Sequence, residues 1–284
     1  MYERVCVAAI SIKPKKWDKA GNADKLESLF REAAREKPRM ILGTEGVLEG
    51  YVAMEAIADP EKAKAMIEIA EPINGPYIQR FRKLARSLRT CLAFGFAERI
   101  KDEAYNCALF IDHQGDIRGR YHKVQLAEGA HPNWYFNRVG SAIRAFDTPV
   151  GRAGFMICND RWNPLIARTL VMDGAQILLI PSYGSRKHHQ NVAVTARSRE
   201  NGVPVVNANV GMNLIVSKGE PIAYAWGVDR ITVGTIDVPL PASTARARSS
   251  EQEFMAYQGP EMKRRYRKTM DRLKSKPKAT RRAK

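Results

Sequence analysis

Short apolar segments, each the length of a buried β-strand, alternate with longer segments of helical periodicity along most of the chain. Each apolar segment is bounded by polar or turn-forming residues, which is typical of strands that are covered on both faces. The predicted strands are 5–10, 40–42, 91–96, 108–111, 154–158, 177–180, 203–210, 214–216, 222–224 and 231–236.

Helical segments lie between several of these strands. We expect Asn22 to cap the first helix, whose apolar face has the i, i+3, i+4, i+7 spacing and consists of Leu26, Leu29, Phe30 and Ala33. Further helices are predicted at 77–88, 164–173 and 192–201. Hairpin turns are predicted at 112–116 and 149–152. Because hairpins are mixed with strand–helix units, the sequence predicts an α/β protein with mixed sheets covered by helices.

The charge of the chain is concentrated near its C-terminus. The chain has 47 Lys and Arg residues and 30 Asp and Glu residues, which gives a net charge of +17. Twelve of these basic residues, but only one acidic residue, lie in 262–284. We therefore expect one domain over 1–240 and a C-terminal extension over 241–284. The extension contains a short basic helix with one apolar face, followed by a disordered basic tail after Lys274. The residues of that apolar face are Met262, Tyr266, Met270 and Leu273.

Several classes of protein are excluded by what the sequence lacks. No apolar run approaches the roughly 18 residues that span a bilayer, and the run 5–10 is too short for a secretion signal. The four cysteines lie far apart, which favours reduced thiols over a disulfide framework or a zinc cluster. No phosphate-binding loop motif is present. We expect a cytoplasmic protein that binds no membrane, metal or cofactor.

Three residues stand at the ends of predicted strands, where active-site residues of α/β proteins are often found. Glu45 follows an apolar strand, where a carboxylate is costly to bury unless it is paired. Lys123 follows the second strand of a hairpin. Cys158 precedes an abrupt change to polar residues, and a nucleophile on such a strand-to-helix turn projects above the sheet. Taken singly, a buried cysteine filling the core, a solvated glutamate and a surface lysine are the plainer interpretations.

The contexts of these residues resemble the nitrilase, or carbon–nitrogen hydrolase, superfamily. Five segments in the family's order, covering roughly residues 4–240, carry the resemblance. They are Gly43-Thr44-Glu45-Gly46, residues 105–112, Tyr121-His122-Lys123-Val124-Gln125-Leu126, residues 154–160 and residues 196–209.

The resemblance implies a four-layer α-β-β-α sandwich with two mixed sheets, assembled as a homodimer or higher homo-oligomer. It also implies attack by a cysteine thiolate on a carbon–nitrogen bond. Cys158 would be the nucleophile, Glu45 the general base and then acid, and Lys123 the cation that stabilises the tetrahedral intermediate. A free thiol is only a few per cent ionised at neutral pH, so it needs such neighbours. The backbone N–H of Asn159 is a further candidate for the oxyanion site.

This chain departs from the family pattern at two places. Many relatives have a second glutamate eight residues after the lysine, where this chain has His131, and Glu128 lies three residues earlier. Glu128 could take the role of that glutamate through a different loop path, His131 could replace it, or neither residue acts. The sequence after the nucleophile resembles the N-carbamoyl-D-amino acid hydrolases, in which two successive arginines hold a substrate carboxylate. Here Arg161 keeps the first arginine and Trp162 replaces the second. One guanidinium still forms a bidentate pair with a carboxylate.

The expected reaction is hydrolysis of a small amide or an N-carbamoyl (ureido) compound, with release of ammonia or an amine. Tyr183 and Arg186 follow the strand 177–180 and could line the substrate pocket, as could Glu128 and His131; a solvated loop is the alternative. The substrate is expected to be a small molecule that carries a carboxylate.

Three other functions remain open from the sequence. The same site could hydrolyse nitriles. A metallohydrolase could use Glu45, Asp160 and the histidines His122, His131 and His188, although no metal-binding spacing is present. A basic nucleic-acid-binding protein would rely on the tail, but strand-gripping patches usually interleave aromatic residues, and Tyr266 alone qualifies there. We therefore expect no specific nucleic-acid binding.

Overall fold

The computed structural model describes residues 2–126, 139–184, 188–241, 252, 256 and 259–275. By their internal contacts, the residues divide into two compact units, Met1–Leu240 and Pro241–Lys284. The first unit contains both sheets and all of the described candidate site residues.

Two mixed β-sheets form the centre of the first unit. The six-stranded sheet has the order β11-β1-β2-β3-β4-β5, and the five-stranded sheet has the order β10-β9-β8-β7-β6. In the first sheet β1 pairs with β2 and β2 with β3 in parallel, whereas the remaining neighbours are antiparallel. In the second, β6, β7 and β8 are parallel and β9 and β10 continue antiparallel.

The elements have the following bounds. The strands are β1 (Tyr2–Ser11), β2 (Met40–Leu42), β3 (Cys91–Ile100), β4 (Glu103–Ile111), β5 (Ile117–His122), β6 (Ala153–Phe155), β7 (Ile177–Ser182), β8 (Val205–Asn209), β9 (Met212–Ser217), β10 (Glu220–Trp226) and β11 (Arg230–Pro239). The helices are α1 (Lys19–Ala33), α2 (Ala53–Ala58), α3 (Pro60–Ile69), α4 (Pro76–Leu88), α5 (Pro164–Met172), α6 (His188–Asn201) and α8 (Gly259–Lys274), with 3-10 turns η1 (Ala34–Glu36) and η2 (Cys158–Trp162).

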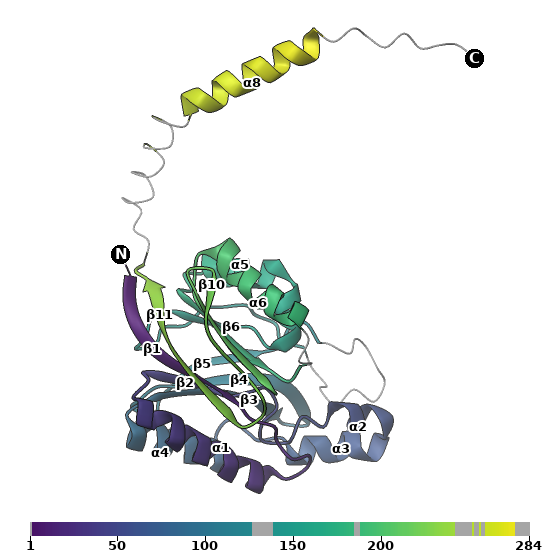
Figure 1. Ribbon diagram of the computed structural model, residues 1–284. Helices are drawn as coiled ribbons and strands as arrows, with labels where there is room; N and C mark the ends of the chain where they lie inside the picture. The colour runs from purple at the N-terminus through teal and green to yellow at the C-terminus, as the bar shows by residue number, and fades with distance from the viewer. Residues whose placement is uncertain are drawn as a thin grey trace, which may run out of the picture. The chain divides into compact units, whose positions relative to one another are not determined.

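The strand side chains alternate between two apolar layers. In β1, Val5, Val7 and Ala9 enter the layer between the sheets, whereas Ala8 and Ile10 pack under α1 and α4. On the other side of the molecule, α5 and α6 cover the outer face of the five-stranded sheet. Figure 1 shows this order of helices, sheet, sheet and helices. The four-layer α-β-β-α sandwich is therefore confirmed.

Two local predictions were wrong, and two helices were not predicted. Asn22 does not cap α1, because Asp18 accepts the Gly21 N–H and Asn22 lies inside the helix, buried and bonded to Leu48 O. Helices α2 and α3 were not predicted at all. The predicted strand 154–158 ends at Phe155, since the N–H of Ile157 is taken by a side chain and not by the neighbouring strand.

The second unit contains α8, which includes the predicted basic helix. Within it, Glu261 forms ion pairs with Arg264 and Arg265, and Tyr266 is exposed. The predicted disorder concerns residues after Lys274, nearly all of which lie outside the described part of the chain. Of the helices in the described ranges, none is both long and apolar enough to cross a lipid bilayer.

Candidate active site

The three candidate catalytic residues stand beyond strand ends, but Cys158 lies three residues after the end of its strand, and not at the strand's last position as predicted. Glu45 lies three residues after β2, Lys123 directly follows β5, and Cys158 opens the turn η2 beyond β6. The first two therefore extend from the six-stranded sheet and the third from the five-stranded sheet. Lys123 and Cys158 both interact electrostatically with Glu45, so the sandwich brings all three together.

Glu45 is completely buried, and both of its carboxylate oxygens are bound. Its Oε1 accepts the Lys123 Nζ at 2.8 Å and the Asn106 Nδ2 at 2.7 Å. Its Oε2 accepts the backbone N–H of Tyr183 at 2.8 Å. Charge-assisted hydrogen bonds of this kind offset the desolvation of a buried carboxylate.

Lys123 is as deeply buried as its partner. Burial lowers the pKa of the Lys123 ammonium, but the charge and hydrogen bond of Glu45, together with the charges of Cys158 and Asp160, outweigh burial, so the pKa lies above its ordinary value. The side chain therefore stays positively charged at neutral pH. It can supply a permanent cation to an anionic intermediate.

A glycine sets the position of the Glu45 backbone. Val47 N–H donates to Gly95 O and Gly95 N–H donates to Thr44 O, so the segment that carries Glu45 runs alongside β3. A Cβ on Gly95 would lie 2.7 Å from the Glu45 Cα, closer than real Cβ atoms approach. Only glycine allows the two backbones this separation.

Cys158 has a left-handed backbone conformation, with φ of 45°. A non-glycine residue in this region is strained and is held there by its surroundings. Asp160 supplies part of that support, because its carboxylate accepts the Ile157 N–H at 2.8 Å, the Gln125 N–H at 3.0 Å and the Tyr121 hydroxyl at 2.8 Å. Burial raises the pKa of Asp160 to about 6, although Lys123 and these donors act in the opposite direction.

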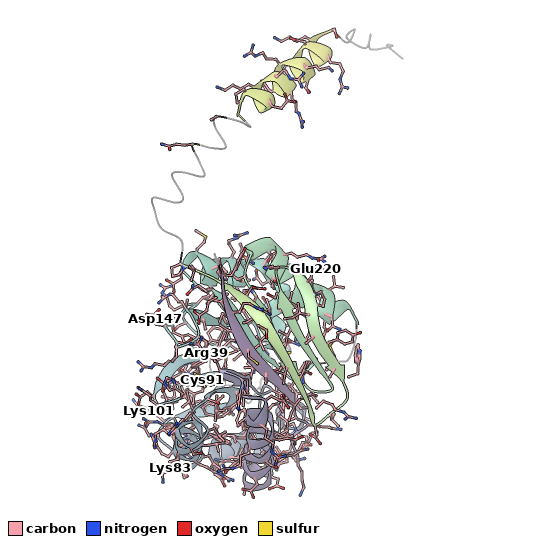
Figure 2. All side chains as sticks on the ribbon, turned by 60° about the vertical axis from the view of Figure 1, so that its left-hand side comes forward. Arg39, Lys83, Cys91, Lys101, Asp147 and Glu220 are labelled. Atoms are coloured by element: carbon pink, nitrogen blue, oxygen red, sulfur yellow. The ribbon has the colours of Figure 1, made fainter. Side chains whose placement is uncertain are left out.

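The four cysteines are distinguished by their neighbours. Burial raises the pKa of Cys6, and it raises the pKa of Cys107 well above its ordinary value. Burial also raises the pKa of Cys91 to about 11; this residue lies beside Arg39 (Figure 2). Burial and the charge of Glu45 also raise the pKa of Cys158, while Arg161 and Lys123 lower it. Cys158 therefore combines a base and two cations around one thiol.

Four of the predicted binding residues lie near this centre. Asn159 Nδ2 donates to Leu126 O at 3.2 Å and so ties the cysteine turn to the segment after Lys123. Arg161 is buried, with its Nε bonded to Cys158 O. Tyr183 stacks on Tyr51, with ring centroids 4.4 Å apart. Trp162 is about half exposed, at 43 %.

The remaining predicted binding residues, Glu128, His131 and Arg186, lie outside the described residues. The side chains of His188 and His189 are likewise not described. The alternatives for the family's second glutamate, which are Glu128, His131 or neither, therefore stay as predictions from the sequence.

The structure also adds supporting residues: Asn106 and Tyr121 were not predicted to belong to the site, and Asp160 was considered only as a metal ligand. Asn106 binds the Glu45 carboxylate, and Tyr121 and Asp160 brace the cysteine turn. Asn106 could have been noticed in the sequence, since it is a polar residue directly before the apolar run 107–111. The N–H of Tyr183 could not be identified from the sequence, because it is a backbone donor and does not depend on the side chain.

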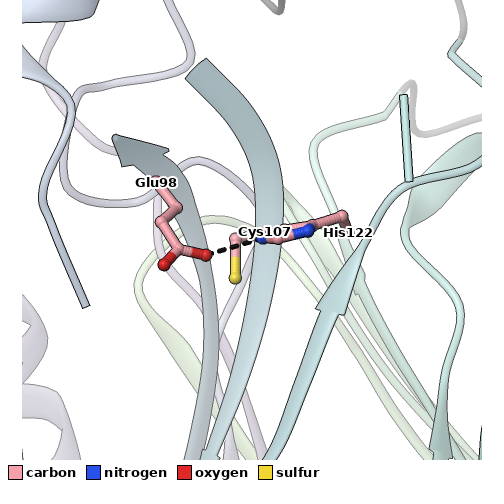
Figure 3. A group of neighbouring side chains, drawn as sticks. All are labelled: Glu98, Cys107 and His122. Atoms are coloured by element: carbon pink, nitrogen blue, oxygen red, sulfur yellow. Dashed lines mark hydrogen bonds and ion pairs between the residues drawn. The ribbon is translucent and has the colours of Figure 1, made fainter. Parts of the chain in front are cut away.

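One described group offers metal-ligand side chains: Glu98, Cys107 and His122 (Figure 3). Both oxygens of Glu98 are already bound, since Arg120 contacts each of them and His122 Nε2 lies 2.7 Å from Oε2. Burial would raise the pKa of Glu98, but these two partners hold it below its ordinary value. The group is a closed ionic network, and its His122 is committed to Glu98 and not to Glu45 or Asp160.

A groove of about 900 Å³ lies over α6, β9 and β10. Exposed apolar side chains line it, among them Val192, Tyr224 and Trp226. None of the three candidate catalytic residues lines this groove, so it is separate from them.

The assembly of the chain as a homodimer or higher homo-oligomer stays a prediction.

Comparison with known proteins identifies the family. The model of the carbon-nitrogen hydrolase family matches residues 6–225. The chain therefore belongs to the carbon–nitrogen hydrolase family and is a hydrolase.

Individual relatives agree with this assignment. The chain is 32% identical to an N-carbamoylputrescine amidase of Oryza sativa subsp. japonica over 218 residues, covering 75% of this chain and 67% of the relative. It is 29% identical to a citrullinase of Francisella tularensis, covering 68% and 69%. Among solved structures, Nit3 of Saccharomyces cerevisiae, a member of the nitrilase superfamily, has the same fold, with a TM-score of 0.72 at 19% identity over 88% of this chain and 94% of that one.

Proposed function

We propose that this protein hydrolyses a small amide or N-carbamoyl compound through an acyl-enzyme intermediate on Cys158. The observation that carries the proposal is the buried Glu45 carboxylate, bonded to Lys123 and interacting with the Cys158 thiol. A base, a cation and a nucleophile in one buried cluster are what cysteine-dependent acyl transfer requires.

The first half of the reaction forms the covalent intermediate. Burial keeps the resting thiol protonated, so Glu45 takes the proton as the sulfur attacks the carbonyl carbon. Lys123 and the Asn159 N–H stabilise the oxyanion, and one such donor is worth about 3–4 kcal/mol of barrier. Glu45 then gives the proton to the leaving nitrogen, the C–N bond breaks, and ammonia or an amine departs.

The second half regenerates the enzyme. Water attacks the thioester carbon while Glu45 takes a proton from it. The C–S bond breaks and the thiolate recovers its proton. Glu45 thus acts as base and as acid within one turnover, which fits a carboxylate held in place by three donors.

The substrate class rests on the relatives. The name of the rice relative specifies an N-carbamoyl compound, and that of the Francisella relative specifies citrulline, which carries a ureido group. We propose a small ureido acid or amide as the substrate and a cytoplasmic location for the enzyme. A carboxylate on the substrate stays an expectation from the sequence, because Arg161 is buried and its Nε and Nη2 are bonded to Cys158 and Ser182.

Ammonia release from a panel of ureido acids, amides and nitriles tests the proposal. The wild-type enzyme should release ammonia from at least one ureido acid or amide, and Cys158→Ala should release none while unfolding at the same urea concentration. Turnover that survives Cys158→Ala, or a preference for nitriles over the whole panel, would refute the proposal.

A further inference from the structure

Arg161 is almost completely buried, at 1% exposure, three residues after the nucleophile. Its Nε donates to Cys158 O at 2.7 Å, and its Nη2 donates to Ser182 Oγ, also at 2.7 Å. Its Nη1 has no hydrogen-bond partner within the described ranges. A buried guanidinium with an unused donor is unfavourable unless a nearby anion balances it.

The two bonds of Arg161 connect the nucleophile to the base. Its Nε fixes the carbonyl of the residue whose backbone is left-handed. Its Nη2 reaches Ser182, and the next residue, Tyr183, donates its backbone N–H to Glu45. The guanidinium thus holds the turn at a fixed position relative to the carboxylate that takes the thiol proton.

The charges around Cys158 come from several elements. Glu45 follows β2, Lys123 follows β5, and Asp160 and Arg161 lie with Cys158 in η2. Helix α6 also packs on η2 and carries the nearly buried Arg197, which forms an ion pair with Glu200.

Among the described residues of η2 and of the strand ends beside it, the carboxylates of Glu45 and Asp160 face two cations, Lys123 and Arg161, so a thiolate makes this group net negative by one charge. Lys123 is bonded directly to Glu45, whereas Arg161 has no carboxylate partner among the described residues. Of the two cations, Arg161 favours the ionised Cys158 more strongly.

We propose that Arg161 is a positioning residue for the nucleophile, holding the Cys158 backbone in place and stabilising the thiolate with its charge. The inference rests on the proposed function, because it assumes that Cys158 is the nucleophile. It differs from the role in which this arginine binds a substrate carboxylate, since it acts in the free enzyme.

The test is the pH profile of alkylation of the free enzyme by iodoacetamide, which is uncharged. Modification of the Cys158 peptide is followed by mass spectrometry in the wild type, Arg161→Gln and Arg161→Lys. Arg161→Gln should raise the pKa of the thiol by about one unit or more, a roughly tenfold loss of thiolate at a given pH below it. Arg161→Lys keeps the charge and should restore most of the reactivity.

Arg168→Gln, which removes an exposed arginine from α5, controls for the loss of one positive charge, and urea unfolding controls for the fold. If the Arg161 variants do not fold, Ser182→Ala removes only a hydroxyl and should give an intermediate rise. The inference would be overturned if the pH profile of alkylation were unchanged in Arg161→Gln, or if Arg161→Gln and Arg161→Lys lost reactivity equally. If Ser182→Ala has to replace these variants, an unchanged thiol pKa in Ser182→Ala would overturn it. Failure of the proposed function is separate, because it appears as turnover by Cys158→Ala.

Discussion

Glu49 gives this fold a pH dependence that a single substitution should remove. The side chain is buried at 1% exposure, and its Oε2 accepts the Ala97 N–H at 2.9 Å. Burial raises its pKa from the ordinary 4.5 to about 7, and the charge of Glu45 adds to the rise, although backbone hydrogen bonds oppose it. In the unfolded chain the carboxyl recovers its ordinary pKa.

The magnitude follows from the two pKa values. The folded state binds the proton more tightly than the unfolded state, so stability is greatest below the unfolded value of 4.5 and falls as the pH rises toward the folded value of about 7. One pKa unit corresponds to about 1.4 kcal/mol, so the whole loss amounts to roughly 3 kcal/mol. Between about pH 5 and about pH 8, most of it should be visible, roughly 2–3 kcal/mol.

Urea unfolding of the wild type and Glu49→Gln at about pH 5 and about pH 8 measures this effect. The glutamine is neutral throughout, so its stability relative to the wild type should rise by roughly 2–3 kcal/mol between the two pH values. A constant offset from the changed hydrogen bonding cancels in this comparison. Glu32→Gln, at an exposed position, controls for the loss of one carboxyl group. A difference between wild type and Glu49→Gln that does not change with pH would refute the reasoning.

Two further substitutions test how the site is held. Gly95→Ala places a Cβ 2.7 Å from the Glu45 Cα and should lower kcat on the order of 100-fold, because it displaces the base. The circular dichroism spectrum should remain that of a folded protein, and an unchanged kcat would contradict the close approach. Tyr121→Phe removes the 2.8 Å bond to Asp160 and should lower the free energy of unfolding in urea by about 1–3 kcal/mol, since it leaves a buried carboxylate with one donor fewer. Equal stability of Tyr121→Phe and wild type would show that the bond is not needed to hold the turn.

Elements with a strong apolar pattern were predictable from the sequence, and those without one were not. Helix α4 has a wide apolar stripe that includes Phe81 and Leu84, and it was found. Helix α2 was missed because it is short and alanine-rich, and α3 because it buries little more than Met66. The cap of α1 was misplaced because Asp18 and Asn22 are both good capping residues and only the tertiary fold buries the second.

The candidate site shows a similar division. Glu45, Lys123 and Cys158 were proposed as site residues because the segments around them resemble motifs of one family in the family's order, whereas each position taken singly has a plainer interpretation. Their supporting bonds could not be predicted, since register and the approach of the two sheets decide which polar groups meet. The role of Arg161 illustrates this: its sequence context indicates a substrate clamp, whereas its hydrogen bonds go to Cys158 and Ser182.

Glu45 and Lys123 extend from one sheet and Cys158 from the other. The apolar layer between the sheets therefore separates the candidate nucleophile from its candidate base. The distance from the thiol to its base is set by how far apart that layer holds the sheets, through side chains such as Val7, Leu42 and Phe155. Interiors are packed closely enough that a change of one methylene group is felt. In the proposed mechanism the apolar core is thus part of the catalytic geometry, and its side-chain volumes affect activity as well as stability.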